Sequence, residues 1–409
     1  MKNNILNENF QRNDFFCQKG KGIFIFEKNR KLFDLSQSSG VYLFGHNHSS
    51  YQNTLKSLLK KKITITSKPN IYAKKLFEII KFFFPNFKKI IFCTTGSESV
   101  SKSLRIAKSI NPNKKFLVSV SGSWHGSVDQ TLFCQNKKKI TPLSAGLDPS
   151  LQKKIIFIPS RDINGSKKIL EKNKDNIYAL IVEPVMCSLP NNHMKNYLKF
   201  LEVFCKKNKI TLIFDEIITG FRTDQKSVQN LYQLKPDITL LGKVLGGGGF
   251  PISGIGLSKK ISLQISKIPN IFFGGTFSAN TISAYVAYKN LLFIKKNIPL
   301  ILKLSEKCKS FEEKINIFLV KNKIEARVYR FCNILRIVFS SKDIKNRTQR
   351  DFLEKKVEKH KQNFIKFLKK KNIYYPPNGI IFFPATITKS QLNYLFKVTS
   401  QGLKKYIKT

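Results

Sequence analysis

Acidic residues are scarce in this 409-residue chain: 25 Asp and Glu stand against 73 Lys and Arg, which leaves a formal net charge of +48. A surface this basic would attract polyanions such as nucleic acids without sequence preference. The lysines, however, are spread over nearly every segment, and no aromatic RNA-binding signature, zinc-finger spacing or basic zipper accompanies them. They occur with heavy use of Phe, Ile and Asn, a bias typical of a coding sequence rich in A and T. We therefore expect no specific nucleic-acid partner.

Cysteine is also sparse, with seven widely separated residues and no Cys-x-x-Cys motif. This pattern indicates neither a disulfide framework nor a zinc cluster, so we predict no metal site. Long apolar runs are missing as well, because lysine interrupts each of them before it reaches the roughly 18 residues that a membrane span requires. The first ten residues are polar and carry no apolar leader. We expect a cytoplasmic protein that does not bind membranes.

Short apolar runs alternate with longer segments of helical periodicity between about residues 88 and 255. The runs predict strands at residues 89–93, 116–120, 155–158, 178–182, 210–214, 238–241 and 252–255. Such alternation is typical of an α/β fold with a largely parallel sheet. We assign residues 51–288 to this large domain.

Two other regions flank the large domain. Residues 1–50 contain a polar lead and a predicted hairpin, with strands at 23–26 and 31–35. Residues 289–409 contain Lys-rich amphipathic helices and a strand pair near 326–330 and 334–339. We expect the C-terminal region to form a smaller α+β domain, against which residues 1–50 pack.

A glycine and small hydroxyl residues, Thr94-Thr95-Gly96-Ser97, join the first strand of the large domain to the next helix. Free amides at a helix start, the helix dipole and hydroxyl donors together bind phosphate, although a plain Ser or Thr N-cap is the alternative. Val100, Leu104 and Ala107 then recur on one face of the helix, and Lys102 points away from that face.

Asp215 follows a buried strand, at the carboxyl end where ligands bind in open α/β sheets. A carboxylate in a semi-buried site needs a cationic partner, and a protonated heteroaromatic nitrogen would serve. The alternative is the N-cap of a following helix. The neighbouring Glu216 is a second candidate, which would face the other way on an extended strand.

Lys243 comes next, between a predicted strand and the glycine run 246–249. The glycines let a ligand approach the backbone closely. A lysine in a pocket of low polarity can lose its proton and form an imine with an aldehyde, whereas a solvated lysine in a tight turn is the alternative. The phosphate seat, the carboxylate at Asp215 and this lysine together indicate pyridoxal 5'-phosphate as the cofactor.

Eight short blocks, taken in chain order, form a pattern more specific than any one of them. These blocks are 22–35, Gly45-His46, Thr95-Gly96-Ser97-Glu98, Ser123-Trp124-His125-Gly126, 181–185, 212–216 with 219–222, Gly242-Lys243 and 275–280. The pattern resembles the class III pyridoxal-phosphate-dependent aminotransferases, and most closely their glutamate-1-semialdehyde 2,1-aminomutase branch.

The resemblance implies the fold of type I pyridoxal-phosphate enzymes and a homodimer with its site at the subunit boundary. It implies that Lys243 joins the cofactor as a Schiff base and that Asp215 contacts the ring nitrogen. Gly96 and Ser97 would bind the phosphate, and Trp124 would stack on the ring in place of the usual tyrosine or phenylalanine. Thr276 would reach the phosphate of the partner subunit's cofactor. His125 could bond a cofactor oxygen or be a structural histidine.

Departures from the branch concern the substrate. The branch carries a Pro-Val-Arg near its start, and this arginine is assigned to the substrate carboxylate. Here only Arg12 and Arg30 precede Arg105, and neither has that context. Ser39-Gly40 lacks the tryptophan that the branch places before its glycine, and residues 379–383 lack an expected glutamate.

We therefore predict amino-group transfer of the aminomutase type on a small amino or keto substrate. An intermolecular aminotransferase acting on a keto sugar or keto acid is the alternative, and a non-catalytic basic binding protein on the same fold is a more distant one. Residues 134–153 are long enough to form a mobile cover over the site, or an ordinary surface loop.

Overall fold

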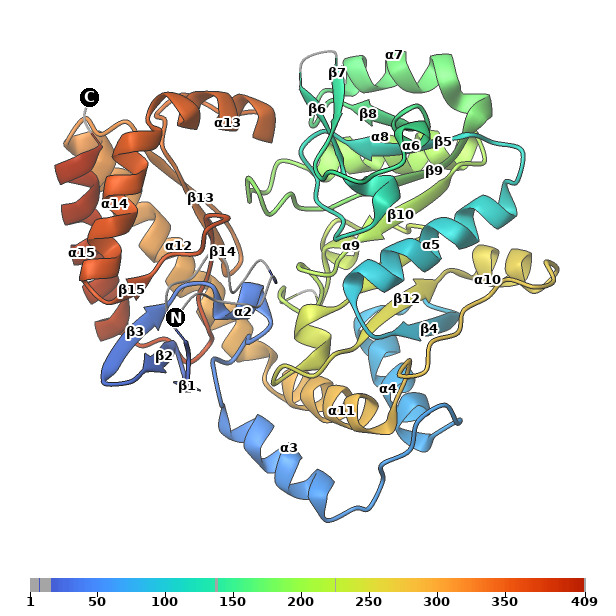
Figure 1. Cartoon of the computed structure of the whole chain (residues 1–409), viewed down its shortest axis with the longest axis horizontal. Coiled ribbons are helices and arrows are strands. Elements are labelled where there is room, and N and C mark those ends of the chain that lie inside the picture. Colours follow the sequence, from blue (N-terminus) through green and yellow to red (C-terminus); the bar gives the residue numbers. More distant parts are fainter. Residues whose placement is uncertain (1–6, 8–15, 137–138, 225, 408–409) are drawn as a thin grey trace.

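The computed structural model describes Asn7 and residues 16–136, 139–224 and 226–407. Two lobes lie side by side (Figure 1), a larger one around a seven-stranded sheet and a smaller one that contains both the blue N-terminal strands and the red C-terminal helices. Arg12, which the sequence analysis considered for the substrate carboxylate, lies outside the described residues. In the part of the chain that the structure describes, we find no helix with the length and apolar character needed to cross a membrane.

The sheet of the larger lobe has the strand order β4-β12-β11-β10-β9-β5-β8. Its strands are β4 Lys89–Cys93, β5 Phe116–Val120, β8 Ile155–Ile158, β9 Ile177–Val182, β10 Thr211–Asp215, β11 Ile238–Leu241 and β12 Ser253–Leu257. Within this sheet only β12 runs antiparallel to its neighbours. All seven predicted strands are confirmed, each within two residues of its expected bounds, because strands covered on both faces appear in the sequence as nearly continuous apolar runs.

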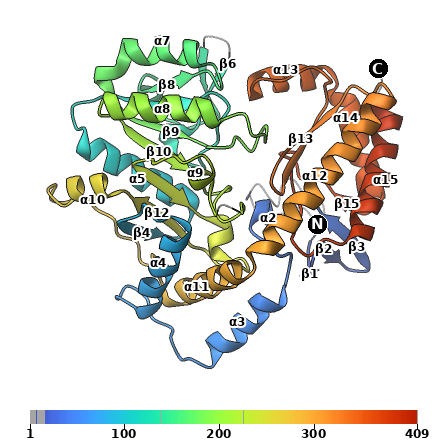
Figure 2. The ribbon, with the colours of Figure 1, turned by 180° about the vertical axis from the view of Figure 1, so that it is seen from behind.

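Helices cover both faces of this sheet (Figure 2). On one face α5, Gly96–Ile110, packs against the side chains of Ala179 and Ile181, and on the other α8, Lys195–Lys207, packs against Leu180 and Val182. The remaining helices of the lobe are α3 Ser49–Leu59, α4 Ile71–Phe83, α6 Pro149–Gln152, α7 Ile163–Asn173, α9 Val228–Leu231, α10 Lys259–Ile265 and α11 Thr281–Lys296, with 3-10 turns η1 Asp129–Thr131, η2 Lys174–Asn176 and η3 Lys243–Gly246.

The smaller lobe joins the two ends of the chain. Its first sheet has the order β1-β2-β3-β15, and its second has β13-β14-β16. Its elements are β1 Lys19–Lys21, β2 Phe24–Glu27, β3 Arg30–Asp34, α2 Gln37–Gly40, α12 Ile298–Lys321, β13 Arg327–Phe331, β14 Ile334–Val338, α13 Arg347–Lys356, α14 Glu358–Lys370, β15 Ile373–Tyr374, β16 Ile380–Phe382 and α15 Lys389–Tyr406. Because β3 pairs in parallel with β15, the N-terminal hairpin is held against the C-terminal region.

The predicted cover at residues 134–153 contains regular structure. Strand β6, Phe133–Asn136, pairs with β7, Lys139–Pro142, and α6 follows, while residues 137–138 lie outside the described part. Among the residues that the structure describes, none of those lining the central cavity, discussed below, comes from this segment.

Candidate active site

The carboxyl ends of several strands of the large sheet meet around one cavity of about 230 Å³. Strands β4, β9, β10 and β11 all end on this side, because β4 and the other parallel strands point the same way. The cavity is lined by Gly96, Ser97, Trp124, Gly126, Glu183, Val185, Cys187, Asp215, Ile217, Ile218, Thr219 and Lys243. Five of the six predicted site residues are therefore brought together, and Thr276 is the exception.

The start of α5 forms one wall of the cavity. The Thr95 side chain caps the helix by accepting a hydrogen bond from the Glu98 amide at 3.2 Å. The amides of Gly96 and Ser97, as the first of the helix, have no intrahelical acceptor. Ser97 Oγ accepts a hydrogen bond from the Ser127 amide at 2.9 Å. Glycine at position 126 permits this close approach, because its φ is +77° and a Cβ there would lie 2.6 Å from Ser97 Oγ. This wall can bind an anion.

Asp215 also lines the cavity and is buried at the end of β10. Its Oδ1 accepts a hydrogen bond from the Ile217 amide at 3.1 Å, and its Oδ2 lies 2.8 Å from His125 Nδ1. With Asp215 as a carboxylate, which only accepts hydrogen bonds, His125 Nδ1–H is the donor. His125 therefore fixes the orientation of the carboxylate. Its other nitrogen, Nε2, is buried without a partner among the described residues.

Two further buried glutamates adjoin Asp215, and they differ in role. Glu183 faces the cavity and accepts hydrogen bonds from the amides of Trp124 at 2.8 Å and Cys187 at 3.3 Å, while burial raises its pKa. Glu216 faces away, as predicted, and accepts hydrogen bonds from the amides of Val228 and Gln229 at the start of α9. Burial raises the pKa of Glu216 to about 7. Glu183 has no separate signal in the sequence.

Lys243 also lines the cavity, and its residue is half-buried. Its backbone lies in the left-handed region, at φ 47°. Burial lowers the pKa of its amine to about 8, and the nearby positive charge of Arg222 acts in the same direction. Its Nζ donates a hydrogen bond to the Ser39 carbonyl at 2.9 Å. A weakly basic amine in a partly apolar pocket is a nucleophile near neutral pH.

The turn that carries Ser39 comes from the smaller lobe. Residues 37–40, which form α2, all have positive φ, at 43°, 52°, 56° and 84°. Arg222 is buried, donates a hydrogen bond to the Gly40 carbonyl and packs 5.1 Å from the Phe382 ring centroid. Contacts from the large lobe therefore hold this turn in an unusual conformation. In the sequence Arg222 is part of a family block, and its burial has no local signal.

Trp124 and Thr276 are the most exposed of the predicted residues. The Trp124 side chain is 51% exposed and lines the mouth of the cavity. Thr276 lies on an exposed segment outside the cavity of its own chain, and its carbonyl accepts a hydrogen bond from Ser67 Oγ at 3.1 Å. Within one chain, therefore, Thr276 has no contact with the site.

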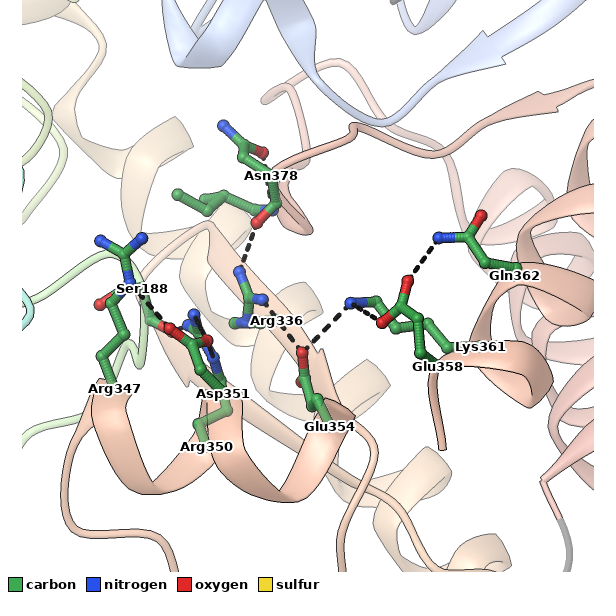
Figure 3. Close-up of polar contacts among 11 residues, drawn as sticks. Ser188, Arg336, Arg347, Arg350, Asp351, Glu354, Glu358, Lys361, Gln362 and Asn378 are labelled. Atoms are coloured by element: carbon green, nitrogen blue, oxygen red, sulfur yellow. Dashed lines mark hydrogen bonds and ion pairs between the residues drawn. The ribbon is translucent and has the colours of Figure 1, made fainter. Parts of the chain in front are cut away.

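A polar network joins the smaller lobe to the loop that follows Glu183 (Figure 3). Arg350 on α13 is buried, donates a hydrogen bond to the Ser188 carbonyl of that loop and bonds Asp351 Oδ1 through Nε at 2.9 Å. One turn further along α13, Glu354 forms ion pairs with Arg336 at 3.6 Å and with Lys361 at 3.4 Å. The position of the loop thus depends on both lobes.

Comparison with known proteins agrees with this geometry. The family model described as Aminotransferase class-III matches residues 6–401. The glutamate-1-semialdehyde 2,1-aminomutase of Archaeoglobus fulgidus is 31% identical over 387 residues, which cover 90% of this chain and 87% of that protein. Among solved structures, an omega-transaminase from Sphaerobacter thermophilus superposes with a TM-score of 0.88 at 18% identity, over 95% of this chain and 91% of that one. A transaminase with PLP bound gives a TM-score of 0.83 at 16% identity, over 96% and 91%. The predicted fold is confirmed.

Proposed function

The chain belongs to the class-III aminotransferases, a family of pyridoxal-phosphate-dependent enzymes, and from this premise we propose that it is a glutamate-1-semialdehyde 2,1-aminomutase, moving an amino group between adjacent carbons of one substrate. The observation that carries the amino-transfer chemistry is the Lys243 amine, with its pKa lowered to about 8, in one cavity with Asp215 and the start of α5. The choice of substrate is supported by the identity to the Archaeoglobus fulgidus aminomutase.

The residues around the cavity fit pyridoxal phosphate in type and in order. Free helix amides at Gly96 and Ser97 suit a phosphate, and the buried carboxylate of Asp215 suits a protonated ring nitrogen. Trp124, which also lines the cavity, offers a flat apolar face. When bound, the cofactor supplies an aldehyde that condenses with amines and a ring that accepts electrons.

Each residue then has a defined part in the reaction. Lys243 Nζ would hold the cofactor through its aldehyde and, as a free amine, would carry a proton between carbon atoms as a general base and acid. Asp215, oriented by His125, would hold the protonated ring nitrogen. Glu183 holds the Trp124 amide, so that the indole is positioned at the cavity mouth.

One observation favours the second candidate, an intermolecular aminotransferase that acts on a keto sugar or keto acid. No arginine is among the described residues that line the cavity, and Arg30 lies on the N-terminal hairpin, where it pairs with Glu27 at 3.6 Å. Among the described residues, the cavity thus lacks the arginine that the aminomutase branch uses for the substrate carboxylate.

The deciding experiment is conversion of glutamate 1-semialdehyde by purified, cofactor-loaded protein without any added amino donor. We expect the isomer with its amino group on carbon 1 to form, because an aminomutase retains the nitrogen it moves. Lys243→Ala is the control and should form none. If conversion requires an added amino donor, or a keto sugar is consumed instead, the intermolecular aminotransferase is the correct function. If wild-type protein mixed with pyridoxal phosphate shows no absorbance from a lysine-bound cofactor, the non-catalytic alternative is correct.

We also propose that the protein is a cytoplasmic homodimer. Thr276 lies outside its own cavity on an exposed segment that also carries the exposed Phe272 and Phe277, as expected of a residue that completes a neighbouring site. All seven cysteines, each within the described residues, are free thiols, which suits a reducing compartment.

A further inference from the structure

Lys102 is one of 63 lysines in the chain, yet its residue is only 5% exposed. The helical periodicity predicts that it lies on the side of α5 that points away from the apolar face. It does lie there, but the segment 271–280 covers it. Its Nζ donates hydrogen bonds to Glu98 Oε1 at 2.5 Å and to the Phe273 carbonyl at 2.8 Å. Burying an ammonium group is costly unless it is paired. These two hydrogen bonds therefore fix the positions of Glu98 and the Phe273 carbonyl relative to α5.

Glu98 links the two sides of this contact. Its Oε2 accepts a hydrogen bond from the Thr94 amide at 2.7 Å, just before the start of α5, and its Oε1 accepts bonds from Lys102 and, at 3.4 Å, from Ser278 Oγ. Burial raises the pKa of Glu98, but the hydrogen bonds from Lys102 and the Thr94 amide outweigh this and hold the pKa below its usual value. Glu98 is therefore a carboxylate at neutral pH.

The residue before Thr276 packs directly on this pair. A Cβ added to Gly275 would lie 3.0 Å from Glu98 Oε1 and 3.6 Å from Lys102 Nζ. On the far side of the segment, Ser67 Oγ donates to the Thr276 carbonyl and Asn70 Nδ2 donates to the Ala279 carbonyl at 2.8 Å. The main chain is thus held from both sides, while the Thr276 side chain remains exposed.

We propose that Lys102 is a positioning residue for the active site of the neighbouring subunit. With Glu98 it holds the segment 271–280 so that Thr276 presents its hydroxyl to the phosphate of the cofactor bound by the partner. The inference rests on the proposed function and on the homodimer. It adds that the helix which binds the phosphate in one site also fixes the segment that completes the other.

Lys102→Met tests this proposal, because it removes both hydrogen bonds and keeps most of the side-chain volume. We expect the homodimeric variant to bind pyridoxal phosphate about tenfold more weakly, a change equivalent to about 1.4 kcal/mol, measured by the visible absorbance of the lysine-bound cofactor. Lys102→Arg should restore most of the affinity. Lys108→Met is the matched control, since Lys108 is exposed on the same helix and also donates to a backbone carbonyl, and it should bind the cofactor as the wild type does.

Mixed dimers distinguish action on the neighbour from action on the same chain. In a dimer of a Lys102→Met chain with a Lys243→Ala chain, the one remaining lysine is completed by a segment that still has Lys102, so we expect wild-type affinity. In a dimer of a wild-type chain with a Lys102→Met, Lys243→Ala chain, the remaining lysine is completed by the altered segment, so we expect the weakened affinity. The reverse pattern would overturn the proposal, as would equal affinities in the two dimers.

Gly275→Ala provides a second variant in case Lys102→Met does not fold. Its methyl group would lie 2.5 Å from Ser278 Oγ, within the segment, and 3.0 Å from Glu98 Oε1, so it would displace the segment without removing a charge. We expect the same pattern in the mixed dimers. A monomeric wild-type protein that still converts its substrate would contradict this inference and the homodimer, and would leave the proposed aminomutase activity intact. An inactive wild-type dimer would contradict the activity alone.

Discussion

At the scale of single residues, the basicity of Lys243 decides when it can react. Burial lowers the pKa of its amine to about 8 from an ordinary value of 10.5. Below pH 8 the amine is mostly protonated and cannot attack an aldehyde, and above pH 8 it is mostly neutral. We expect the rate at which cofactor-free protein combines with pyridoxal phosphate to rise through about pH 8 and then level off. Absorbance measured after rapid mixing checks this, and a rate that keeps rising towards pH 10.5 would show an ordinary, solvated lysine.

Asp215 and Glu216 offer a matched pair for the second residue-scale prediction. Asp215 faces the cavity and Glu216 faces the start of α9, although they are adjacent in the chain. Asp215→Asn should lower kcat about 10²–10³-fold, because it removes the charge that keeps the ring nitrogen protonated. Glu216→Gln should keep kcat within about threefold, because this side chain lies outside the cavity. Its single amide oxygen can accept a hydrogen bond from only one of the two α9 amides, so we expect the free energy of unfolding to fall instead. Steady-state kinetics on both variants, at full cofactor occupancy, measures the two values of kcat. Equal losses of kcat would contradict this prediction.

At the scale of elements, local sequence explains the sheet but not the contacts made across the chain. The strands were predictable because each buries both faces and so leaves an apolar run that needs no knowledge of its neighbours. The conformation of Ser39 was not predictable, because its positive φ depends on hydrogen bonds from residues about two hundred positions away. Lys243 donates to the Ser39 carbonyl, and Arg222 donates to the Gly40 carbonyl. The burial of Lys102 was hidden for the same reason: its cover is the distant segment 271–280, and nothing on α5 itself distinguishes it from an exposed lysine.

The contact of α13 with the larger lobe gives an element-scale prediction. Arg350 donates a hydrogen bond to the Ser188 carbonyl, and burial lowers its pKa to about 10 (Figure 3). Arg350→Ala leaves that carbonyl unpaired, at a cost of about 1–3 kcal/mol in the free energy of unfolding. We expect a lower urea midpoint together with a raised KM, because the loop after Glu183 loses its support from the smaller lobe.

Lys355→Ala is the control for Arg350, because Lys355 lies exposed on the same helix. It should change neither the urea midpoint nor the KM. A lower midpoint for Arg350→Ala without any change in KM would show that Arg350 stabilises the lobe contact but does not position the loop that lines the cavity.

At the scale of the whole molecule, the exposed aromatic side chains predict how two copies associate. Phe272 and Phe277 are both well over half exposed, and they flank Thr276 on a segment held against residues 65–70. Large exposed apolar side chains next to one another mark an interface. We expect a dimer in sedimentation equilibrium and a shift towards monomer for Phe277→Asp, with weaker cofactor binding in parallel. Phe352→Asp, which removes an exposed phenylalanine on α13 instead, should remain dimeric.

The net charge sets the response of the whole fold to salt. With 25 acidic residues for 73 Lys and Arg, at least 48 cations have no acidic residue of their own, so repulsion among them opposes the compact state. Between about 0.1 and 1 M salt the Debye length falls from about 10 to 3 Å, which screens exposed charges and leaves buried pairs nearly unchanged. We therefore expect Tm, measured by circular dichroism, to rise by a few degrees over this range, and to rise much less in sucrose of equal osmolality. A Tm that falls as NaCl is added would mean that exposed ion pairs, rather than repulsion between lysines, dominate the electrostatic free energy of folding.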